Sequence, residues 1–253
     1  MKIALLTPMY DGRAHDDYMR SVSASMRALA KDGHVVGWYT ATNSAILYRA
    51  RNQLVAQALA DAADLLIWID SDIGFDVASM RDLVAHLERG EAIVAGAPQK
   101  RSRRWNEAPG VAFRPFEEGP LRTDEHGLIP VRGLATAFLG SRAEVYRAML
   151  EGHEARRVII PGTDARTWPY SALYFWHGVE KIDDPVVLRA AAELGVDPDH
   201  LHQDVGEDYW FCERALELGF TPKLAPGLRL RHWEGRCVHD FAFEPSPAEG
   251  ETP

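Results

Sequence analysis

The chain has 253 residues, 46% of them hydrophobic and 26% charged, which predicts a packed core in one large α/β domain or two small ones. Its formal net charge of −9 disfavours broad nucleic-acid binding, and no apolar run approaches the ~20 residues of a membrane span. The two cysteines, Cys212 and Cys237, lie outside any CxxC motif, so neither a zinc site nor a disulfide framework is expected.

Strands and helices are predicted to alternate through residues 1–99. Apolar or β-branched runs predict strands at residues 2–7, 34–40, 65–69 and 92–97. Amphipathic spacing predicts helices at residues 16–31, 44–62 and 76–89, with Ser44 and Asp76 as N-caps. Residues 65–69 are apolar on both faces, which favours a central parallel strand. The alternation predicts βαβ units, and an opening strand too short for a signal peptide predicts a cytoplasmic protein.

The rest of the chain has a different pattern. Strands are predicted at residues 111–116, 128–139 and 221–233. Helices are predicted at 208–218, where Cys212 is a core residue, and at 141–152, where Ser141 and Glu144 form a capping box. Residues 153–205 are less regular and carry an aromatic cluster of Trp168, Tyr170, Tyr174, Phe175 and Trp176, which either belongs to the core or stacks on a sugar or base of an acceptor. Residues 244–253 are rich in Pro, Glu, Ser and Gly, which predicts a disordered tail.

Two carboxylates, Asp70 and Asp72, follow the strongest predicted strand. A parallel strand carries them to the carboxyl edge of the sheet, where open α/β sheets bind ligands. Residues i and i+2 of an extended chain point to the same side, so both carboxylates can converge on one hard cation such as Mg²⁺ or Mn²⁺. Because they repel each other, a positive partner is expected beside them. The alternative interpretation is a turn with an aspartate cap.

Three further segments carry polar side chains with two interpretations each. Glu207 and Asp208 open a predicted helix, where the helix dipole favours acids and where a rigidly held general base is equally possible. His232, near the end of the last predicted strand, suits Mn²⁺ as a neutral imidazole, although a lone histidine is more often structural. Arg49 and Arg51 do not share a helix face, so one can face a ligand and hold ribose or diphosphate oxygens while the other faces solvent. The alternative is an ordinary solvated face.

Taken together, these segments resemble the GT-A glycosyltransferases, and more closely the small bacterial and phage members with family-2-like sequences. The resemblance spans most of residues 1–235 in order and spacing. Its motifs are Thr7-Pro8-Met9-Tyr10, residues 51–55, residues 66–75 around Asp70-Ser71-Asp72, residues 133–138, residues 206–214 and His232. It implies an α/β, GT-A-like fold with a Rossmann-like, mostly parallel central sheet flanked by helices. It also implies one catalytic domain over residues 1–243, with a nucleotide-binding half at 1–99 and a smaller, mixed acceptor and sugar half at 100–243.

The resemblance implies a donor site built around a cation. Asp72 is expected to bind the Mn²⁺ or Mg²⁺ that bridges the donor diphosphate, Asp70 to contact the ribose or the metal shell, and His232 to complete the coordination. The donor is expected to be a UDP-sugar. The residues expected to contact it, besides Asp70, are Pro8 and Tyr10 at the base, Arg51 near the ribose or phosphates, and Ser71.

The resemblance also implies a sugar pocket and a base. Ala135, Thr136 and Ala137 are expected to line the pocket, and Ala137 departs from the family's frequent glycine there and narrows it. Asp208 is the candidate general base, with Glu207 beside it. Both inverting and retaining transfer stay open.

The implied function is a metal-dependent transfer of a sugar from a nucleotide-diphosphate donor to a hydroxyl acceptor. The acceptor is a glycan or, against the acidic net charge, modified DNA. The basic run Lys100, Arg101, Arg103 and Arg104 is either an anion-binding patch or a solvated loop.

Other functions with a similar sheet remain as alternatives. A sugar-phosphate nucleotidyltransferase usually has a glycine-rich loop after the first strand, which residues 7–12 lack. A haloacid-type phosphatase places its acids directly after the first strand, whereas Asp70 and Asp72 follow a later one. The non-enzymatic alternative is a protein that binds a nucleotide-sugar without turnover.

Overall fold

The computed structural model describes residues 1–98, 112–117, 119–152, 155–160, 163–182, 185–197, 202–234 and 237–241. The strands of its larger sheet are β1 (Lys2–Met9), β2 (Val35–Thr42), β3 (Leu65–Ile69), β5 (Ile93–Ala95), β7 (Ile129–Pro130), β9 (Phe138–Arg142) and β12 (Pro222–Leu224). Its helices, within these residues, are α1 (Asp16–Lys31), α2 (Leu47–Ala60), α3 (Val77–Glu88), α4 (Ala143–Glu151), the 3-10 helix η1 (Ala165–Tyr170), α5 (Pro185–Glu193) and α6 (Glu207–Glu217). The expected alternation of strands and helices in the first part of the chain is confirmed.

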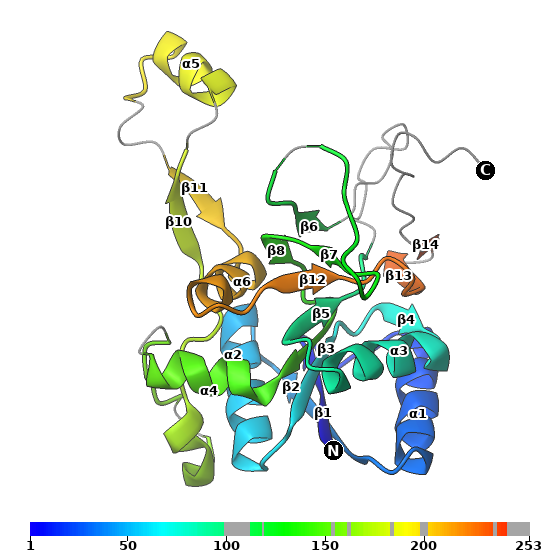
Figure 1. The fold of residues 1–253 in the computed structure, drawn as a ribbon. Helices are drawn as coiled ribbons and strands as arrows, with labels where there is room; N and C mark the ends of the chain where they lie inside the picture. Colours follow the sequence, from blue (N-terminus) through cyan, green and yellow to red (C-terminus); the bar gives the residue numbers. More distant parts are fainter. Residues whose placement is uncertain are drawn as a thin grey trace, which may run out of the picture.

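The central sheet has seven strands in the order β2-β1-β3-β9-β5-β12-β7 (Figure 1). Strands β2, β1, β3, β5 and β12 run in one direction, and β9 and β7 run in the other. The expected central parallel strand, β3, is parallel to β1 on one side but antiparallel to β9 on the other. Every residue of β3 is buried. The sheet is therefore mixed but mostly parallel, as predicted.

Helices cover both faces of the sheet, which explains why β3 is apolar at every position. Because side chains alternate along a strand, consecutive residues of β1 and β3 enter two different hydrophobic clusters. On one face, α2, α4 and α6 pack over Ala4, Leu6, Leu66 and Trp68. On the other face, α1 and α3 pack over Ile3, Leu5, Ile67 and Ile69 (Figure 1). Cys212 of α6 is buried in the first cluster, as expected.

In the part of the chain that the structure describes, three smaller sheets lie outside the central one. The first contains β4 (Ile73–Phe75), β13 (Leu230–Glu234) and β14 (Cys237–Phe241), with β13 antiparallel to both neighbours. The second pairs β6 (Phe113–Arg114) with β8 (Gly133–Leu134). The third pairs β10 (Gly178–Lys181) with β11 (His202–Val205) in an arm that carries α5 away from the main body (Figure 1). The first of these sheets brings the far end of the chain beside the end of β3.

Two expected helix caps are wrong. Ser44 does not cap α2, because the helix begins at Leu47 after Ile46, and the Ser44 hydroxyl donates to the Ile46 carbonyl instead. Ser141 does not form a capping box, because it belongs to β9 and its buried hydroxyl bonds Tyr146 Oη at 2.8 Å. The expected cap at Asp76 is confirmed, since its Oδ1 accepts the Ser79 amide at 2.7 Å.

Two long predicted strands are divided in the structure. The run at 128–139 contains β7 and the start of β9, which belong to the central sheet, and between them β8, which belongs to a smaller sheet. The run at 221–233 contains β12 of the central sheet and β13 of the smaller one. Pro226 and Gly227 lie between β12 and β13, and both residues interrupt a strand. Hydrophobic content predicted extended chain correctly but did not predict where one sheet gives way to another.

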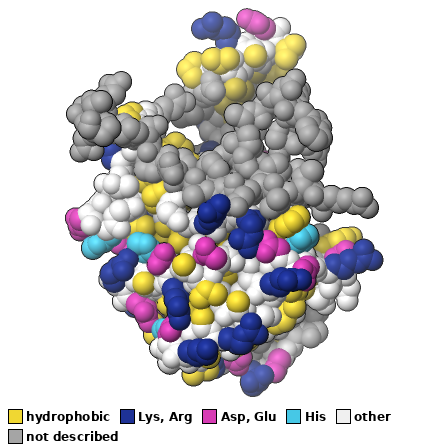
Figure 2. Space-filling model, turned by 90° about the vertical axis from the view of Figure 1, so that its right-hand side faces the viewer, with side chains coloured by type: hydrophobic (Ala, Val, Ile, Leu, Met, Phe, Trp, Pro, Cys, Tyr) yellow, Lys and Arg dark blue, Asp and Glu magenta, His cyan; other side chains and the backbone are white. Residues whose placement is uncertain are grey.

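The surface over α1 and α3 has mixed charge. Figure 2 shows this face, which lies on the right in Figure 1, and its described part has Lys and Arg side chains interspersed with Asp and Glu. An extended area of one sign, as broad binding of a polyanion requires, is not seen in that part. Among the described helices, none is long and apolar enough to cross a membrane.

The Asn52 side chain in α2 hydrogen-bonds the backbone of a distant loop, and we expect its removal to lower the stability of the fold. The buried Asn52 side chain donates to the Phe175 carbonyl at 2.9 Å and accepts the Phe175 amide at 2.9 Å. Asn52→Ala leaves both backbone groups unsatisfied, so we expect the free energy of unfolding to fall by about 2–4 kcal/mol in urea denaturation. Gln53→Ala, at the less buried next position, should change it by less than about 0.5 kcal/mol. Equal effects of the two variants would contradict this account.

Candidate functional site

The segment Asp70-Ser71-Asp72 forms the turn between β3 and β4. The Asp70 amide donates to the Ala137 carbonyl at 3.0 Å, and the Ile73 amide donates back to the Asp70 carbonyl at 3.0 Å. Because β3 is buried and ends at the carboxyl edge of the sheet, the chain emerges there. The Asp70 and Asp72 side chains are 35% and 25% exposed. Both carboxylates are thus rigidly mounted but accessible to a ligand.

His232 lies beside Asp72, although the two residues are far apart in sequence. β13 pairs with β4 so that His232 stands opposite Ile73, and the Trp233 amide donates to the Asp72 carbonyl at 3.0 Å. The His232 Nε2 atom is 3.7 Å from Asp72 Oδ2. An imidazole and a carboxylate at this separation can share one cation.

Arg51 of α2 lies between the acidic turn and the start of α6. Its side chain is 4% exposed, and its Nη1 donates to Glu207 Oε1 at 2.7 Å. Its Nη2 lies 3.6 Å from Asp70 Oδ1. Arg49 is exposed, so the two arginines do lie on different faces. Arg51 supplies the positive partner that the repelling carboxylates require, whereas the sequence suggested a contact to ribose or phosphate.

Asp208 occupies the first turn of α6 beside Glu207, and burial raises the pKa of its carboxyl. The positive charge of Arg51 opposes this shift, and the negative charge of Glu207 adds to it. The Tyr209 amide donates to Asp208 Oδ1 at 2.8 Å, which orients the group. A carboxylate with a raised pKa is a stronger base than an exposed one, provided that it is ionised at the working pH.

A hollow of about 290 Å³ adjoins the acidic turn. Part of its lining comes from the end of β1, the residue after it and the turn itself, namely Pro8, Met9, Tyr10, Asp70, Ser71 and Asp72. The rest comes from the end of β2 and the start of α2, namely Ala41, Ser44, Ala45, Leu47 and Ala50. Tyr10 is 71% exposed at this hollow, so its ring is available to a planar ligand.

The expected sugar-pocket residues Ala135, Thr136 and Ala137 are not among the residues that line this hollow. They lie between β8 and β9, and Ala137 reaches the site through its carbonyl bond to Asp70. Thr136 is buried, and within the described part of the chain its hydroxyl has no hydrogen-bond partner. An unsatisfied buried hydroxyl so close to the acidic turn is a group that a bound polar ligand or water could satisfy.

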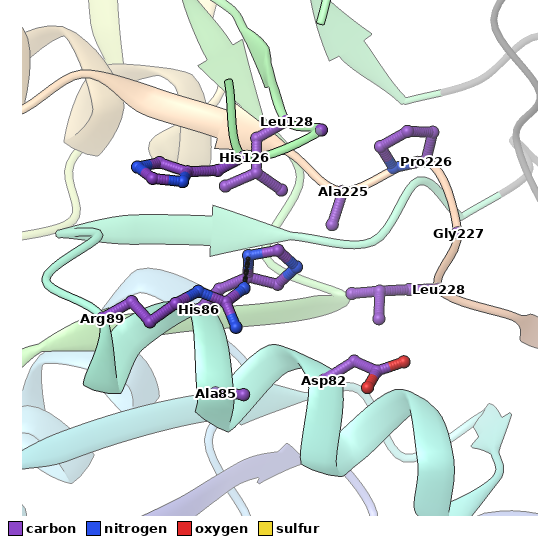
Figure 3. A pocket seen from close by; sticks show the side chains of 11 residues that line it. Asp82, Ala85, His86, Arg89, His126, Leu128, Ala225, Pro226, Gly227 and Leu228 are labelled. Carbon is purple, nitrogen blue, oxygen red and sulfur yellow. Dashed lines mark hydrogen bonds between the residues drawn. The ribbon is translucent and has the colours of Figure 1, made fainter. Parts of the chain in front are cut away.

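A second hollow, of about 250 Å³, lies between the end of α3 and the segment after β12 (Figure 3). His86, Arg89 and His126 supply its basic side chains, and Arg89 Nη2 is 2.8 Å from His86 Nδ1. None of the residues singled out from the sequence lines it. Basic groups in the last turn of a helix also stabilise that helix, which explains His86 and Arg89 without a ligand.

The side chains expected to bind a metal are only partly gathered in the structure. Within the described residues, no group of three or more His, Cys, Asp or Glu side chains is arranged to hold a cation. Asp72 and His232 face each other, whereas Asp70 lies next to Arg51. The expected three-residue ligand set therefore stays a prediction.

Sequence reasoning missed the residues that hold His232 in place. Asp17 accepts hydrogen bonds from Arg231 and Trp233, which flank it, and His15 stacks on Trp233 with ring centroids 4.0 Å apart. The only signal in the sequence was a pair of acids at the start of a helix, which is the ordinary pattern of a helix N-terminus.

The remaining predicted features are either divided by the fold or lie outside the described residues. Of the aromatic cluster, Tyr174 and Phe175 are core residues, while Trp168 and Trp176 are 48% and 40% exposed. Stacking on an acceptor therefore remains open only for the exposed members. The basic run Lys100, Arg101, Arg103 and Arg104 lies outside the described residues, and so does the predicted tail at 244–253.

Comparison with known proteins identifies the fold. No family model matches the sequence, and no curated protein matches it. The crystal structure of A197 from STIV matches with a TM-score of 0.53 at 12% identity, over 100% of this chain and 99% of that chain. The expected α/β fold, with a mostly parallel central sheet flanked by helices, is confirmed.

Two further similar structures are glycosyltransferases. GalNAc-T7 with UDP, GalNAc and Mn²⁺ matches with a TM-score of 0.45 at 12% identity, over 91% of this chain and 43% of that one. A glycosyltransferase involved in the glycosylation of the major capsid of PBCV-1 matches at 0.34 and 10% identity, over 60% and 63% of the two chains. These likenesses are too distant to establish an activity.

The ion pairs of Arg51 predict a large loss of stability when its charge is removed. Arg51→Met keeps the apolar stem but leaves the largely buried Glu207 without its partner. Breaking a buried pair from one side costs about 3–5 kcal/mol, which urea denaturation would measure. Arg49→Met, on the exposed face of the same helix, is the control and should cost less than about 0.5 kcal/mol. Similar losses in both variants would refute the structural role of the Arg51 pairs.

Proposed function

We propose that this chain is a metal-dependent glycosyltransferase that moves a sugar from a nucleotide-diphosphate donor to a hydroxyl acceptor. The observation that carries the proposal is the meeting of Asp72 and His232 at the carboxyl edge of the central sheet, next to a hollow with Tyr10 on its wall. Both predicted halves of the chain, residues 1–99 and residues 100–243, contribute side chains to this site. We therefore infer that residues 1–243 act as one catalytic domain.

The charge of the site supports the metal. The site contains four carboxylates and the guanidinium of Arg51, which pairs with two of them. The carboxylates belong to Asp70, Asp72, Glu207 and Asp208. A diphosphate would add further negative charge, so a divalent cation is needed to join protein and donor. Asp72 and His232 offer one oxygen and one nitrogen, a set that suits Mn²⁺ and is acceptable to Mg²⁺. The residues present thus fit the metal that the sequence predicts.

The donor nucleotide would occupy the hollow beside the acidic turn. Tyr10 and Pro8 offer apolar surface to a base. We expect Asp70 and Ser71, which also line the hollow, to contact the ribose or the metal shell. We expect a UDP-sugar. Ala135, Thr136 and Ala137 lie behind Asp70, and in this proposal the sugar is bound on their side of the turn.

In the transfer step, Asp208 accepts the proton of the acceptor hydroxyl as that oxygen attacks the anomeric carbon, and the nucleoside diphosphate departs. The cation, when bound, neutralises the charge that develops on the leaving diphosphate. Arg51 holds Glu207, and through it the start of α6, so that Asp208 keeps a fixed position. Direct attack with Asp208 as base inverts the anomeric configuration.

The donor can be identified before the acceptor is known. A thermal-shift screen would test UDP, other nucleotides and their sugar conjugates, each with and without Mn²⁺. A specific ligand at a hundredfold excess over its Kd adds about 2.7 kcal/mol of stability. Pyrophosphate release from a nucleoside triphosphate and a sugar phosphate would instead favour a nucleotidyltransferase. Binding without hydrolysis or transfer to any glycan or modified DNA would favour a binding protein.

Asp72 should be needed for turnover. Asp72→Ala removes a carboxylate proposed to hold the cation, which contributes several kcal/mol to leaving-group departure, so we expect donor hydrolysis or transfer to fall about a hundredfold or more. Asp164→Ala, which removes an exposed cap of η1 outside the site, is the matched control and should retain activity. Full metal-dependent turnover by Asp72→Ala would remove the assignment.

The pH profile should depend on Arg51. Asp208 works as a base only when ionised, so kcat/KM should fall as the pH drops through its raised pKa, above the ordinary carboxylate value of about 3.9. Arg51 lowers this pKa, so Arg51→Gln should raise it further and move the acidic limb of kcat/KM to higher pH. Arg49→Gln is the control and should leave the limb in place. An unmoved limb in Arg51→Gln would argue against Asp208 as the base.

A further inference from the structure

The Asp17 carboxylate of α1 hydrogen-bonds the two residues of β13 that flank His232. Its Oδ2 and Oδ1 atoms accept hydrogen bonds from Arg231 Nε and Nη2, both at 2.8 Å. Its Oδ2 also accepts the indole N–H of Trp233 at 2.9 Å. Residues 231 and 233 point to one side of the strand and residue 232 to the other, because side chains alternate along a strand. Fixing the two flanking residues therefore fixes the direction in which His232 points.

Asp17 is itself held at a defined place by the start of α1. His15 precedes α1, and its Nδ1 accepts the Asp17 amide at 3.3 Å while its ring stacks on Trp233. The His15 amide donates to the Ser71 carbonyl at 2.8 Å. The helix start thus contacts the acidic turn and β13 together. It therefore fixes the position of the turn that carries Asp72 relative to the strand that carries His232.

The packing leaves little room for Asp17 to move. A Cβ atom added to Gly74 of β4 would lie 1.9 Å from Asp17 Oδ2, so the carboxylate rests directly against the strand that follows Asp72. Arg231 Nη2 also approaches the Phe75 carbonyl at 3.4 Å. The carboxylate therefore lies against the paired strands β4 and β13 where Gly74 stands opposite Arg231, and any side chain at position 74 would collide with it.

We propose that Asp17 is a positioning residue that aims the His232 imidazole at Asp72. It does not itself reach the cation, and it acts by holding Arg231 and Trp233. The proposed metal function underlies only the consequence for cation binding. Residues that orient a metal-binding histidine typically change metal affinity by about 10–100-fold when they are replaced.

A matched control exists at the opposite end of α1. Asp32, just after α1, makes a similar two-bond pair with Arg81, at 2.7 and 2.9 Å. Asp32→Asn removes a comparable aspartate–arginine ion pair that does not involve β13. Asp17→Asn and Asp32→Asn therefore weaken the same kind of ion pair, and only the first of these pairs lies next to His232.

The first experiment measures the position of His232 without any metal. In a chain with ¹³C-labelled histidine rings, the His232 signal is assigned by its disappearance in His232→Ala. We expect Asp17→Asn to shift and broaden this signal and Asp32→Asn to leave it unchanged. An unmoved His232 signal in a folded Asp17→Asn chain would overturn the proposal, whether or not the protein binds a cation.

The second experiment measures Mn²⁺ binding from the electron paramagnetic resonance signal of the free ion. Asp17→Asn should weaken binding about 10–100-fold, whereas Asp32→Asn should not change it. If Asp17 acts through His232, adding Asp17→Asn to His232→Ala should cause no further loss. A full additional loss in that double variant would refute action through the histidine. If the unsubstituted chain binds no Mn²⁺, the metal part of the proposed function fails, and the histidine signal alone decides the role of Asp17.

Discussion

The backbone of the turn at Asp70-Ser71-Asp72 is the constraint on which the site depends. The Asp70 amide bonds the Ala137 carbonyl, the Ser71 carbonyl accepts the His15 amide, and the Asp72 carbonyl accepts the Trp233 amide. Segments from the start, middle and end of the chain thus each form a backbone hydrogen bond with one of these three consecutive residues. With the backbone groups bonded in this way, the Asp70 and Asp72 side chains are not needed to satisfy them, which suits a ligand site at a sheet edge.

Burial of charge is the second feature that organises this region. Arg51 is almost completely buried, and a buried guanidinium is tolerated only when carboxylates and good geometry compensate for its lost hydration. Glu207 and Asp70 provide that compensation, and Phe175 lies beneath the guanidinium at 5.7 Å. Asn52 in turn fixes Phe175 through its backbone. The electrostatics of the acidic site are therefore supported by the same aromatic core that holds α2, α4 and α6 on the sheet.

The sequence predicted the structure well where the local pattern of one segment was sufficient to identify its element. The run Leu65–Ile69 had to be a buried strand, and the acids after it had to emerge at its carboxyl end, because both follow from local pattern alone. The alternation of strands and helices before residue 99 followed from the same periodicities. The antiparallel β9 between β3 and β5 was not predictable, because a short apolar run does not specify its direction or its neighbours. Ser141 and Ser44 failed as caps for a related reason, since tertiary burial and the chain path decide where a hydroxyl points.

The sequence could not predict which distant residues contact each other, because these contacts form only when the strands pair. Nothing local distinguishes Asp17 from any other acid in the first turn of a helix, and its meaning arises only when β13 pairs with β4. The same holds for Arg51, whose charge gains its role from Glu207, 156 residues away. In the proposed function, Asp72 and His232 give a cation only part of its coordination, and a hard divalent ion fills the remainder with water and phosphate oxygens. Cation and diphosphate then stabilise each other's binding, because each supplies what the protein lacks for the other. A site built in this way binds its cation most strongly when a diphosphate ligand is present.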